Sequence, residues 1–332
     1  MKILITGGSG FIGTNLILLL EKDSNISIIN VDKKAPTCSN HTKYWHEINI
    51  MDTEGLTKIF QIFQPEFVVH LAARTDTNSK NLGDYSENIQ GTRNLTEAIK
   101  NSQTVLYTIF ASTQYVYKSN INNLPDTDFT FEPHTAYGES KKIGEVLIRE
   151  SGLKCAYSII RPTNVWGPWH MRYPNELWRI IDKGFYFHPK GKNPIKSYAY
   201  VKNVVHQIKM MLYTPLYEVD KQVYYVGDHP IQSRKWLDAF SFELRGRNVF
   251  SLPKYFLFFL ALSGTLFNRV GISFPLNLIR YNNIIDNYDT PMKKTIDKFG
   301  LSHPDLASNV KETIEWVKTE GRVFFQYWKI KY

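Results

Sequence analysis

A glycine-rich turn between an apolar run and an apolar helix is the feature that most limits how this chain can fold. Residues 2–5, Lys-Ile-Leu-Ile, are typical of a buried strand, and residues 11–20 have the composition of a helix. The turn between them carries Gly7, Gly10 and Gly13. A strand, a tight glycine turn and a helix in this order let a diphosphate approach the backbone at the helix N-terminus. The segment therefore predicts a dinucleotide site, with a purely structural turn as the alternative.

The same strand-to-helix rhythm continues through the first half of the chain. Further strands are predicted at residues 26–31, 67–71, 105–110 and 157–160, and further helices at residues 54–63, 88–100 and 136–150. This alternation predicts an α/β fold with a doubly wound parallel sheet, a Rossmann domain, over residues 1–165. Beyond that point the rhythm becomes irregular. We therefore expect a smaller substrate-binding domain over residues 166–332, with some segments returning to the Rossmann sheet.

Composition narrows the kinds of partner and the compartment. The formal net charge of +9 favours anionic partners. The sequence has no run of five like charges and no nucleic-acid-binding motif, so we expect no nucleic acid. The expected partner is a phosphate-bearing small molecule or an anionic lipid surface. Cys38 and Cys155 lie far apart, and the histidines show no metal-ligand spacing. We expect free thiols, no metal and a cytoplasmic location, since the chain opens on a strand rather than a leader peptide.

An acidic residue at the end of the second strand indicates the type of dinucleotide. Asp32 lies 19 residues after Gly13, where a carboxylate can accept hydrogen bonds from the ribose hydroxyls and would repel a 2′-phosphate. This favours NAD. Lys33 and Lys34 follow directly and could bind a 2′-phosphate, so NADP stays open, and Asp32 could alternatively cap a turn.

Tyr137 and Lys141 are the candidate proton-transfer pair. They lie four residues apart in a predicted helix and so project from one face. A tyrosine pKa of about 10 is lowered by a nearby ammonium group and by a positive nicotinamide ring, which would let the phenol move a proton while hydride leaves the same carbon. The Tyr-x-x-x-Lys spacing starts at residues 137, 186, 198, 217 and 327. Only the first follows the fourth predicted strand, with Thr113 lying 24 residues upstream.

Together these segments resemble the extended short-chain dehydrogenase/reductase family of NAD-dependent sugar epimerases and dehydratases. The resemblance rests on residues 6–13, 32, 70–73, 88–95, 111–117, 137–141 and 161–168, and it weakens beyond residue 168. It implies that Thr113 is the catalytic Ser/Thr, Tyr137 the acid/base, and Lys141 the ribose-binding lysine that lowers the tyrosine pKa. The cofactor-binding residues that it implies are Gly7, Gly10, Phe11, Ile12, Gly13, Asp32, Asn49, Ile50, Leu71, Ala72, Ala73, Asn88, Tyr137 and Lys141.

The substrate side departs from the family pattern in ways that affect the reaction. The 4,6-dehydratases carry Asp-Glu directly after the catalytic threonine, whereas this chain has Gln114 and Tyr115, which argues against a dehydratase. By the resemblance, Asn164 approaches the substrate diphosphate. Lys196 takes the place of the usual diphosphate-clamping arginine, and a lysine cannot form its bidentate fork. His170 is a further candidate for substrate contact.

The sequence leaves three functions open. The leading one is an NAD-dependent 4-epimerase of an activated sugar, linked to a nucleotide or a polyprenyl diphosphate. The second is an NAD(P)H-dependent 4-ketosugar reductase, and the third is a non-catalytic dinucleotide-sensing or scaffold protein. We also expect a homodimer.

An apolar segment in the second half suggests contact with a membrane. Residues 252–262 are apolar except for Lys254, and Arg245, Arg247 and Arg269 flank them. Such a segment can lie in an anionic lipid interface as a peripheral contact. The chain is also similar to epimerases of undecaprenyl-diphosphate-linked N-acetylglucosamine, which carry an apolar stretch near this position. The alternative is a helix packed into the second domain.

Overall fold

A parallel sheet forms the centre of the N-terminal half of the chain. The computed structural model describes residues 1–118, 125–269, 271, 274 and 276–331, and within them this sheet has seven strands in the order β3-β2-β1-β4-β5-β6-β11. This is the doubly wound Rossmann arrangement that the sequence predicts. The strands are β1 (Lys2–Thr6), β2 (Ser27–Asp32), β3 (Trp45–Glu47), β4 (Phe67–His70), β5 (Tyr107–Ala111), β6 (Ala156–Pro162) and β11 (Gln222–Val226).

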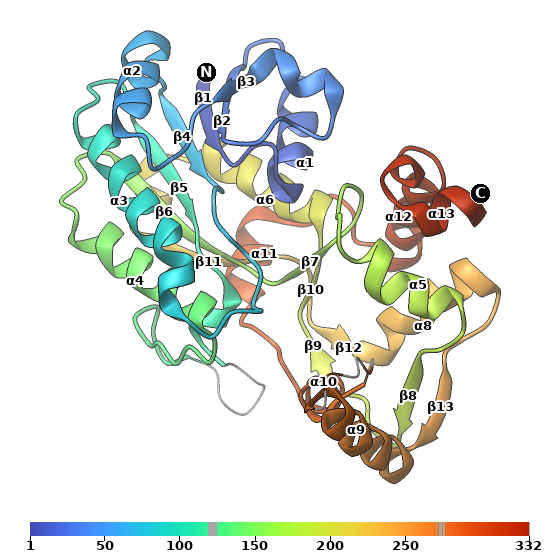
Figure 1. Ribbon diagram of the computed structural model, residues 1–332. Coiled ribbons are helices and arrows are strands. Elements are labelled where there is room, and N and C mark those ends of the chain that lie inside the picture. Colours follow the sequence, from blue (N-terminus) through green and yellow to red (C-terminus); the bar gives the residue numbers. More distant parts are fainter. Residues whose placement is uncertain (119–124, 270, 272–273, 275, 332) are drawn as a thin grey trace.

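Helices cover both faces of the sheet (Figure 1). On one face lie α1 (Phe11–Leu20) and α6 (Val201–Tyr213), and on the other lie α2 (Thr53–Phe63), α3 (Ser86–Lys100) and α4 (Ala136–Glu150). Successive residues of β1 enter the two resulting cores, because side chains alternate across a strand. Ile3 and Ile5 pack in one core, and Leu4 packs in the other. Burial on both faces explains why these strands are continuous apolar runs.

The remaining chain builds a second lobe from short strand pairs and helices. The pairs are β7 (Asn164–Trp166) with β10 (Tyr198–Tyr200), β9 (Ile195–Lys196) with β12 (Ile231–Gln232), and β8 (Phe187–Lys190) with β13 (Phe250–Pro253). Two further helices, α7 (Leu216–Val219) and α11 (Lys293–Phe299), pack against strands of the Rossmann sheet. The helices of the second lobe are α5 (Arg179–Asp182), α8 (Ser233–Arg245), α9 (Lys254–Arg269), α10 (Leu278–Ile285), α12 (Leu306–Lys318) and α13 (Gln326–Lys331). Its core is rich in aromatic rings, including Trp166, Trp178 and Trp236.

The predicted elements of the first half agree with the structure to within two residues. α1 and α4 have the predicted bounds, and β5 begins two residues later than expected. The sequence analysis missed β3, which has only three residues, and β11, which lies beyond residue 165 but joins the main sheet. β11 and α6 both come from beyond residue 165, where the sequence predicts that some segments return to this sheet. The division into two domains at residue 165 stays a proposal.

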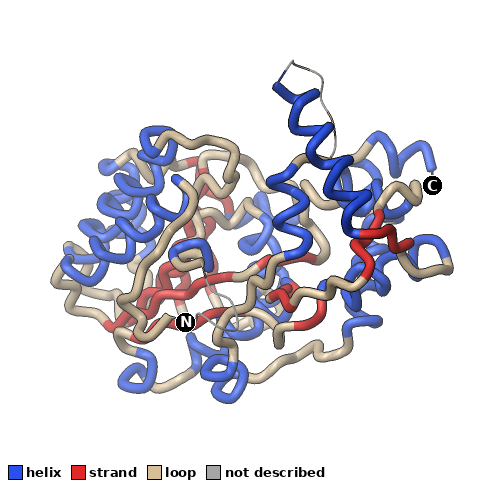
Figure 2. Tube along the Cα trace, turned by 90° about the horizontal axis from the view of Figure 1, so that it is seen from below, coloured by secondary structure: helices blue, strands red, loops and turns tan. Residues whose placement is uncertain are grey.

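The pair formed by α9 and α10 projects from the second lobe (Figure 2). Leu257 and Ala261 of α9 pack with Tyr281 of α10 in a small core of their own. Among the described residues, no helix combines the length and the apolar character needed to cross a membrane.

Candidate active site

The glycine turn after β1 has a shape that larger residues would destroy. Gly7 has a φ of +74°, and a Cβ at this position would lie 2.5 Å from the Ala72 nitrogen. A Cβ on Gly13 would lie 2.4 Å from the Gly7 carbonyl oxygen. Neither position has room for a side chain, so the turn can bring bare backbone up to a ligand.

The N-terminus of α1 offers free hydrogen-bond donors beside this turn. The helix begins after Gly10, whose position provides no side-chain cap. The first intrahelical bond runs from the Thr14 amide to the Gly10 carbonyl, at 2.8 Å. In the part of the chain that the structure describes, the amides of Phe11, Ile12 and Gly13 have no recorded partner. These amides and the helix dipole fit a diphosphate group.

Asp32 lies at the end of β2, next to the glycine turn. Its carboxylate accepts hydrogen bonds from the amides of Ser9 at 3.1 Å and Lys34 at 2.9 Å, and partial burial raises its pKa. These bonds fix the carboxylate where a ribose would lie. Lys33 forms an ion pair with Glu87 at 2.6 Å. Of the two lysines, Lys34 is therefore the one that could bind a 2′-phosphate.

Asn49 and Ile50 lie between β3 and α2, at the position assigned to adenine. The Asn49 Oδ1 accepts a hydrogen bond from the Met51 amide at 3.0 Å, so part of its acceptor capacity serves a turn. Ile50 is buried, and its carbonyl accepts a bond from the Asn94 amide group at 3.1 Å. An adenine contact for Asn49 stays a prediction.

The loop after β4, which contains Leu71, Ala72 and Ala73, is tied to both neighbouring elements. The Leu71 amide donates to the Thr6 carbonyl at 2.9 Å. The Asn88 side chain accepts from the Arg74 amide at 2.8 Å and donates to the Arg74 carbonyl at 3.0 Å and to the Ser140 hydroxyl at 3.1 Å. Asn88 therefore holds this loop against α4, and a direct contact with a cofactor stays a prediction.

The candidate catalytic residues meet beyond the carboxyl end of β5. Thr113 follows β5, and Tyr137 lies in the first turn of α4, where the Thr135 hydroxyl caps the helix by accepting from the Gly138 amide at 2.9 Å. The Thr113 side chain lies close enough to Tyr137 to favour its phenolate. Burial raises the Tyr137 pKa above its usual value, and the influence of Thr113 opposes that shift only in part.

Lys141 lies one turn after Tyr137 but directs its ammonium group elsewhere. The Nζ donates to the Ala111 carbonyl at 2.8 Å, and burial lowers the Lys141 pKa to about 8. Lys141 is not among the groups that shift the Tyr137 pKa. The sequence predicts that a nearby ammonium group lowers the tyrosine pKa. The Tyr137 pKa is raised instead, because burial of the phenol outweighs the influence of Thr113.

Two tyrosine rings lie next to Tyr137, and a third joins the cluster through Tyr115. The Tyr137 ring lies 6.0 Å from Tyr85 and 6.3 Å from Tyr115, measured between centroids. Tyr288, which follows α10, lies 5.9 Å from Tyr115 and donates its hydroxyl to the Gln114 carbonyl at 3.2 Å. No local motif marks Tyr85 or Tyr288, since only the fold brings them together.

Gln114 occupies the position next to the catalytic threonine. Its Nε2 donates to the Oδ1 of Asn164 at 3.0 Å. Its Oε1 is buried and has no partner among the described residues. Neither Gln114 nor Tyr115 supplies a carboxylate, and no carboxylate contributes to the Tyr137 pKa shift within the described residues.

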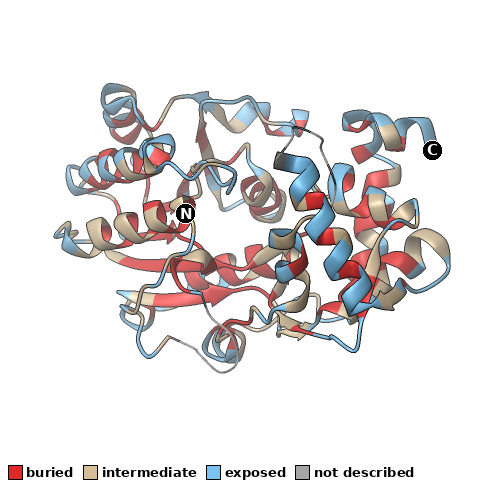
Figure 3. Ribbon diagram, turned by 60° about the horizontal axis from the view of Figure 1, so that its bottom comes forward, coloured by how far each residue is buried: buried red, intermediate tan, exposed pale blue. Residues whose placement is uncertain are grey.

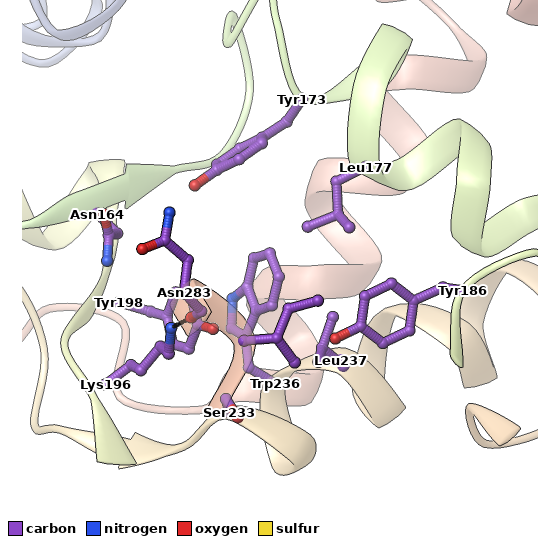
Figure 4. A pocket seen from close by; sticks show the side chains of 11 residues that line it. Asn164, Tyr173, Leu177, Tyr186, Lys196, Tyr198, Ser233, Trp236, Leu237 and Asn283 are labelled. Carbon is purple, nitrogen blue, oxygen red and sulfur yellow. Dashed lines mark hydrogen bonds between the residues drawn. The ribbon is translucent and has the colours of Figure 1, made fainter. Parts of the chain in front are cut away.

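A pocket of about 200 Å³ opens beside Asn164 (Figure 4). The Tyr173 and Tyr186 hydroxyls point into it, and Trp236 forms part of its wall. Lys196 donates to the Asn283 carbonyl, and burial lowers the Lys196 pKa to about 8. The structure therefore places Lys196 and Asn164, both predicted substrate residues, on one pocket with aromatic walls.

His170 is held within the protein. Its Nδ1 accepts bonds from the amides of Arg172 at 3.2 Å and Tyr173 at 3.0 Å, and its ring packs 4.7 Å from Phe11. Burial lowers the His170 pKa to about 3, so the ring is neutral at physiological pH. These contacts make His170 a packing residue of the loop after β7.

Comparison with known families and sequences gives consistent matches. The sequence model of the NAD dependent epimerase/dehydratase family matches residues 3–227. A dTDP-D-glucose 4,6-dehydratase of Dictyostelium discoideum is 31% identical over 243 residues, covering 64% of this chain and 55% of that protein. An N-acetyl-alpha-D-glucosaminyl-diphospho-ditrans,octacis-undecaprenol 4-epimerase of Escherichia coli O157:H7 is 31% identical over 219 residues, covering 64% of this chain and 63% of that protein. The match thus spans less than two thirds of these relatives.

Solved structures share the fold over nearly the whole chain. The UDP-glucose 4-epimerase of Thermotoga maritima with UDP-glucose has a TM-score of 0.74 and 21% identity, covering 96% of this chain and 99% of that one. The UDP-glucuronic acid 4-epimerase of Bacillus cereus, in complex with UDP-glucuronic acid and NAD, has a TM-score of 0.72 and 20% identity, covering 96% and 100%. At this identity the likeness establishes the fold.

Proposed function

Because this chain belongs to the NAD-dependent epimerase/dehydratase family, we propose that it is an NAD-dependent 4-epimerase of an activated sugar. The observation that carries the proposal is the close approach of Thr113 to Tyr137, next to a glycine turn that fits a dinucleotide diphosphate. The turn, the β4 loop and Thr113 follow parallel strands of one sheet, so they meet at the same edge.

Each residue of the site would have its own role in this reaction. NAD, when bound, accepts a hydride from the sugar carbon and returns it to the other face. Tyr137 takes the proton from the 4-hydroxyl and gives it back, while Thr113 hydrogen-bonds the same oxygen as it becomes a carbonyl. Lys141 would hold the nicotinamide ribose, and the positive nicotinamide ring would favour the Tyr137 phenolate.

The residues after Thr113 argue against a dehydratase. Eliminating water from a sugar requires one group to donate a proton and another to remove one. The Gln114 amide does neither at neutral pH, and its Nε2 is already bonded to Asn164. The phenol of Tyr115 has a pKa raised by burial, which makes it a poor base. These substitutions favour epimerisation even though some relatives are named dehydratases.

The pocket beside Asn164 supports a substrate with a diphosphate and a large carrier group. Lys196 provides the positive charge, and Tyr173, Tyr186 and Trp236 provide flat surfaces. The buried Ser233 hydroxyl and the Trp236 Nε1 have no hydrogen-bond partner in the described structure. We propose a nucleotide or a polyprenyl diphosphate as the carrier, since one relative acts on a sugar diphospho-undecaprenol by its name.

The test is to incubate the purified protein with UDP-, GDP- and dTDP-sugars and with polyprenyl-diphosphate sugars. An epimerase gives the 4-epimer with no net change in nicotinamide absorbance. Stoichiometric loss of NADH or NADPH with a 4-ketosugar would instead identify the reductase. Dinucleotide binding with no turnover of any sugar would identify the sensing or scaffold protein.

The cellular setting is part of the same proposal. We propose a cytoplasmic homodimer with a peripheral membrane contact. The two cysteines, Cys38 and Cys155, are both free thiols, which suits a reducing compartment. Sedimentation velocity would test the dimer.

A further inference from the structure

The outward face of α9 consists of large apolar side chains. Tyr255, Phe256 and Phe259 are exposed over 67, 57 and 63% of their surface, and Leu262 and Leu266 continue the same face along the helix. Figure 3 shows most of α9 as exposed. The sequence analysis left open a helix packed into the second domain, but packing accounts for only the opposite side of α9.

This arrangement is unusual for a helix on a protein surface. Such a helix normally turns its apolar side chains inward and its polar side chains to water. In α9 the inward residues, Leu257 and Ala261, are apolar too, so the helix is apolar on both sides. A contiguous exposed apolar face of this kind indicates an interaction site.

The charged residues of the segment that carries this face are all positive. Residues 244–285 contain no aspartate or glutamate, although they include five basic residues. Three of these lie against exposed rings: the guanidinium groups of Arg245 and Arg247 are 5.9 and 5.3 Å from the Phe250 ring centroid, and the Lys254 ammonium is 4.9 Å from that of Tyr255. The apolar face thus has a cationic border at the start of α9.

We propose that the α9 face docks on an anionic phospholipid bilayer, with the helix lying in the interface. Aromatic and aliphatic side chains would enter the acyl boundary, and Arg247 and Lys254 would bind the lipid phosphates. A second copy of the chain is a poorer occupant. It would set one acid-free cationic segment against another if the two faces met around a two-fold axis.

The docking face is connected directly to the pocket beside Asn164. α10 packs on α9 through Tyr281, whose ring lies 5.8 Å from Phe258, and the Thr265 hydroxyl accepts from the Leu278 amide at 3.0 Å. Asn283 and Ile284 of the same helix α10 line the pocket. If the proposed function holds, this connection suits a sugar diphosphate whose lipid chain remains in the bilayer.

Vesicle cosedimentation tests the docking without any sugar or catalysis. We expect the full chain to bind vesicles of equal parts phosphatidylcholine and phosphatidylglycerol, and to bind phosphatidylcholine vesicles more weakly. The double variant Phe256→Ser/Phe259→Ser removes two apolar anchors, so its partition coefficient should fall about tenfold or more. The matched control Ile62→Ser/Tyr217→Ser replaces two comparably exposed apolar residues of the other lobe and should bind like the wild type.

A second variant separates charge from apolar contact. Arg247→Glu/Lys254→Glu keeps the apolar face and should lose the preference for anionic vesicles, and near-ultraviolet circular dichroism would verify that each variant is folded. Equal sedimentation of the wild type and Phe256→Ser/Phe259→Ser would overturn the proposal. So would a wild-type dimer that this variant converts to a monomer, since a second copy would then cover α9. Because the assay needs no turnover, failure of the proposed enzymatic function would leave its result unaffected.

Discussion

At the residue scale, a buried phenol such as Tyr137 keeps its proton unless a nearby positive charge or hydrogen bond compensates for the burial. Tyr137→Phe removes the group that exchanges the proton and leaves the ring in place. Turnover should fall by a factor of about 10² to 10⁴, because general acid–base catalysis is worth that much. The assay is the rate of 4-epimer formation, with the amount of bound NAD as the control. A variant that turns over at the wild-type rate would remove Tyr137 from the mechanism.

The lowered pKa of Lys196 predicts that substrate binding depends on pH. Because this pKa is about 8, the Lys196 side chain is positively charged below that pH and loses its charge as the pH rises through it. Substrate capture, measured as kcat/KM, should therefore decline above this pH in the wild type. In Lys196→Arg the guanidinium stays charged, since its pKa exceeds about 12. Lys141 titrates in both proteins, so the ratio of wild-type to variant kcat/KM isolates Lys196. A ratio that is constant with pH would contradict a role in binding the diphosphate.

The sequence could identify Tyr137 because its surroundings are local. Tyr137 lies on a helix that follows a predicted strand, and that context separates it from four other Tyr-x-x-x-Lys spacings. Tyr85 and Tyr288 contact the same cluster from distant parts of the chain, and no motif in the sequence around them predicts these contacts. The direction of the Tyr137 pKa shift was equally hidden, since it depends on burial.

At the scale of elements, the turn between β1 and α1 should tolerate no added side chain. Gly13→Ala places a Cβ against the backbone of Gly7 and Gly8, and such overpacking typically costs about 1–3 kcal/mol. We expect NAD affinity, measured by calorimetry, to fall at least about tenfold. The matched control is Gly144→Ala in α4, where the nearest atom to the new Cβ lies 3.8 Å away. Equal NAD affinity in the two variants would contradict a dinucleotide site at this turn.

The helix that carries Tyr137 is anchored by a buried ion pair. Glu145 of α4 accepts two hydrogen bonds from the Arg161 guanidinium of β6, at 2.9 and 2.8 Å, and both side chains are almost fully buried. Glu145→Ala leaves an uncompensated buried charge and should lower the free energy of unfolding by about 3–5 kcal/mol. Glu139→Ala breaks an exposed pair with Lys142 on the same helix and should cost less than about 1 kcal/mol. Urea denaturation measures both values, and similar losses would show that the buried pair does not anchor α4.

Elements whose ends have local chemical signals were the ones that the sequence predicted well. α4 begins where Thr135 caps it, and α1 begins after the glycine turn. β3 has three residues and lies at the edge of the sheet, so its pattern is too short to recognise. β11 reads as a strand only once its pairing with β6, about sixty residues earlier in the chain, is known.

At the scale of the whole molecule, the elements of the second lobe could not be predicted because they pair with segments far away in the sequence. β8 pairs with β13, which lies more than fifty residues later in the chain. The core of the second lobe consists of aromatic rings from several segments. Short strands of this kind gain their stability from packing and carry little intrinsic preference. The Rossmann sheet, in contrast, repeats one local unit, which a sequence pattern can reveal.

The connection from α9 through α10 to the pocket gives a prediction that involves both ends of the second lobe. If α9 holds the protein on the bilayer, Phe256→Ser/Phe259→Ser should slow epimerisation of a polyprenyl-diphosphate sugar embedded in anionic vesicles about tenfold, since the local enzyme concentration at the surface falls. The same variant should act like the wild type when the lipid-linked sugar is dispersed in detergent, because the pocket itself is unchanged. Equal rates on vesicles would mean that the substrate reaches the pocket without help from α9. A matching loss in detergent would instead show that α9 shapes the pocket through Asn283 and Ile284.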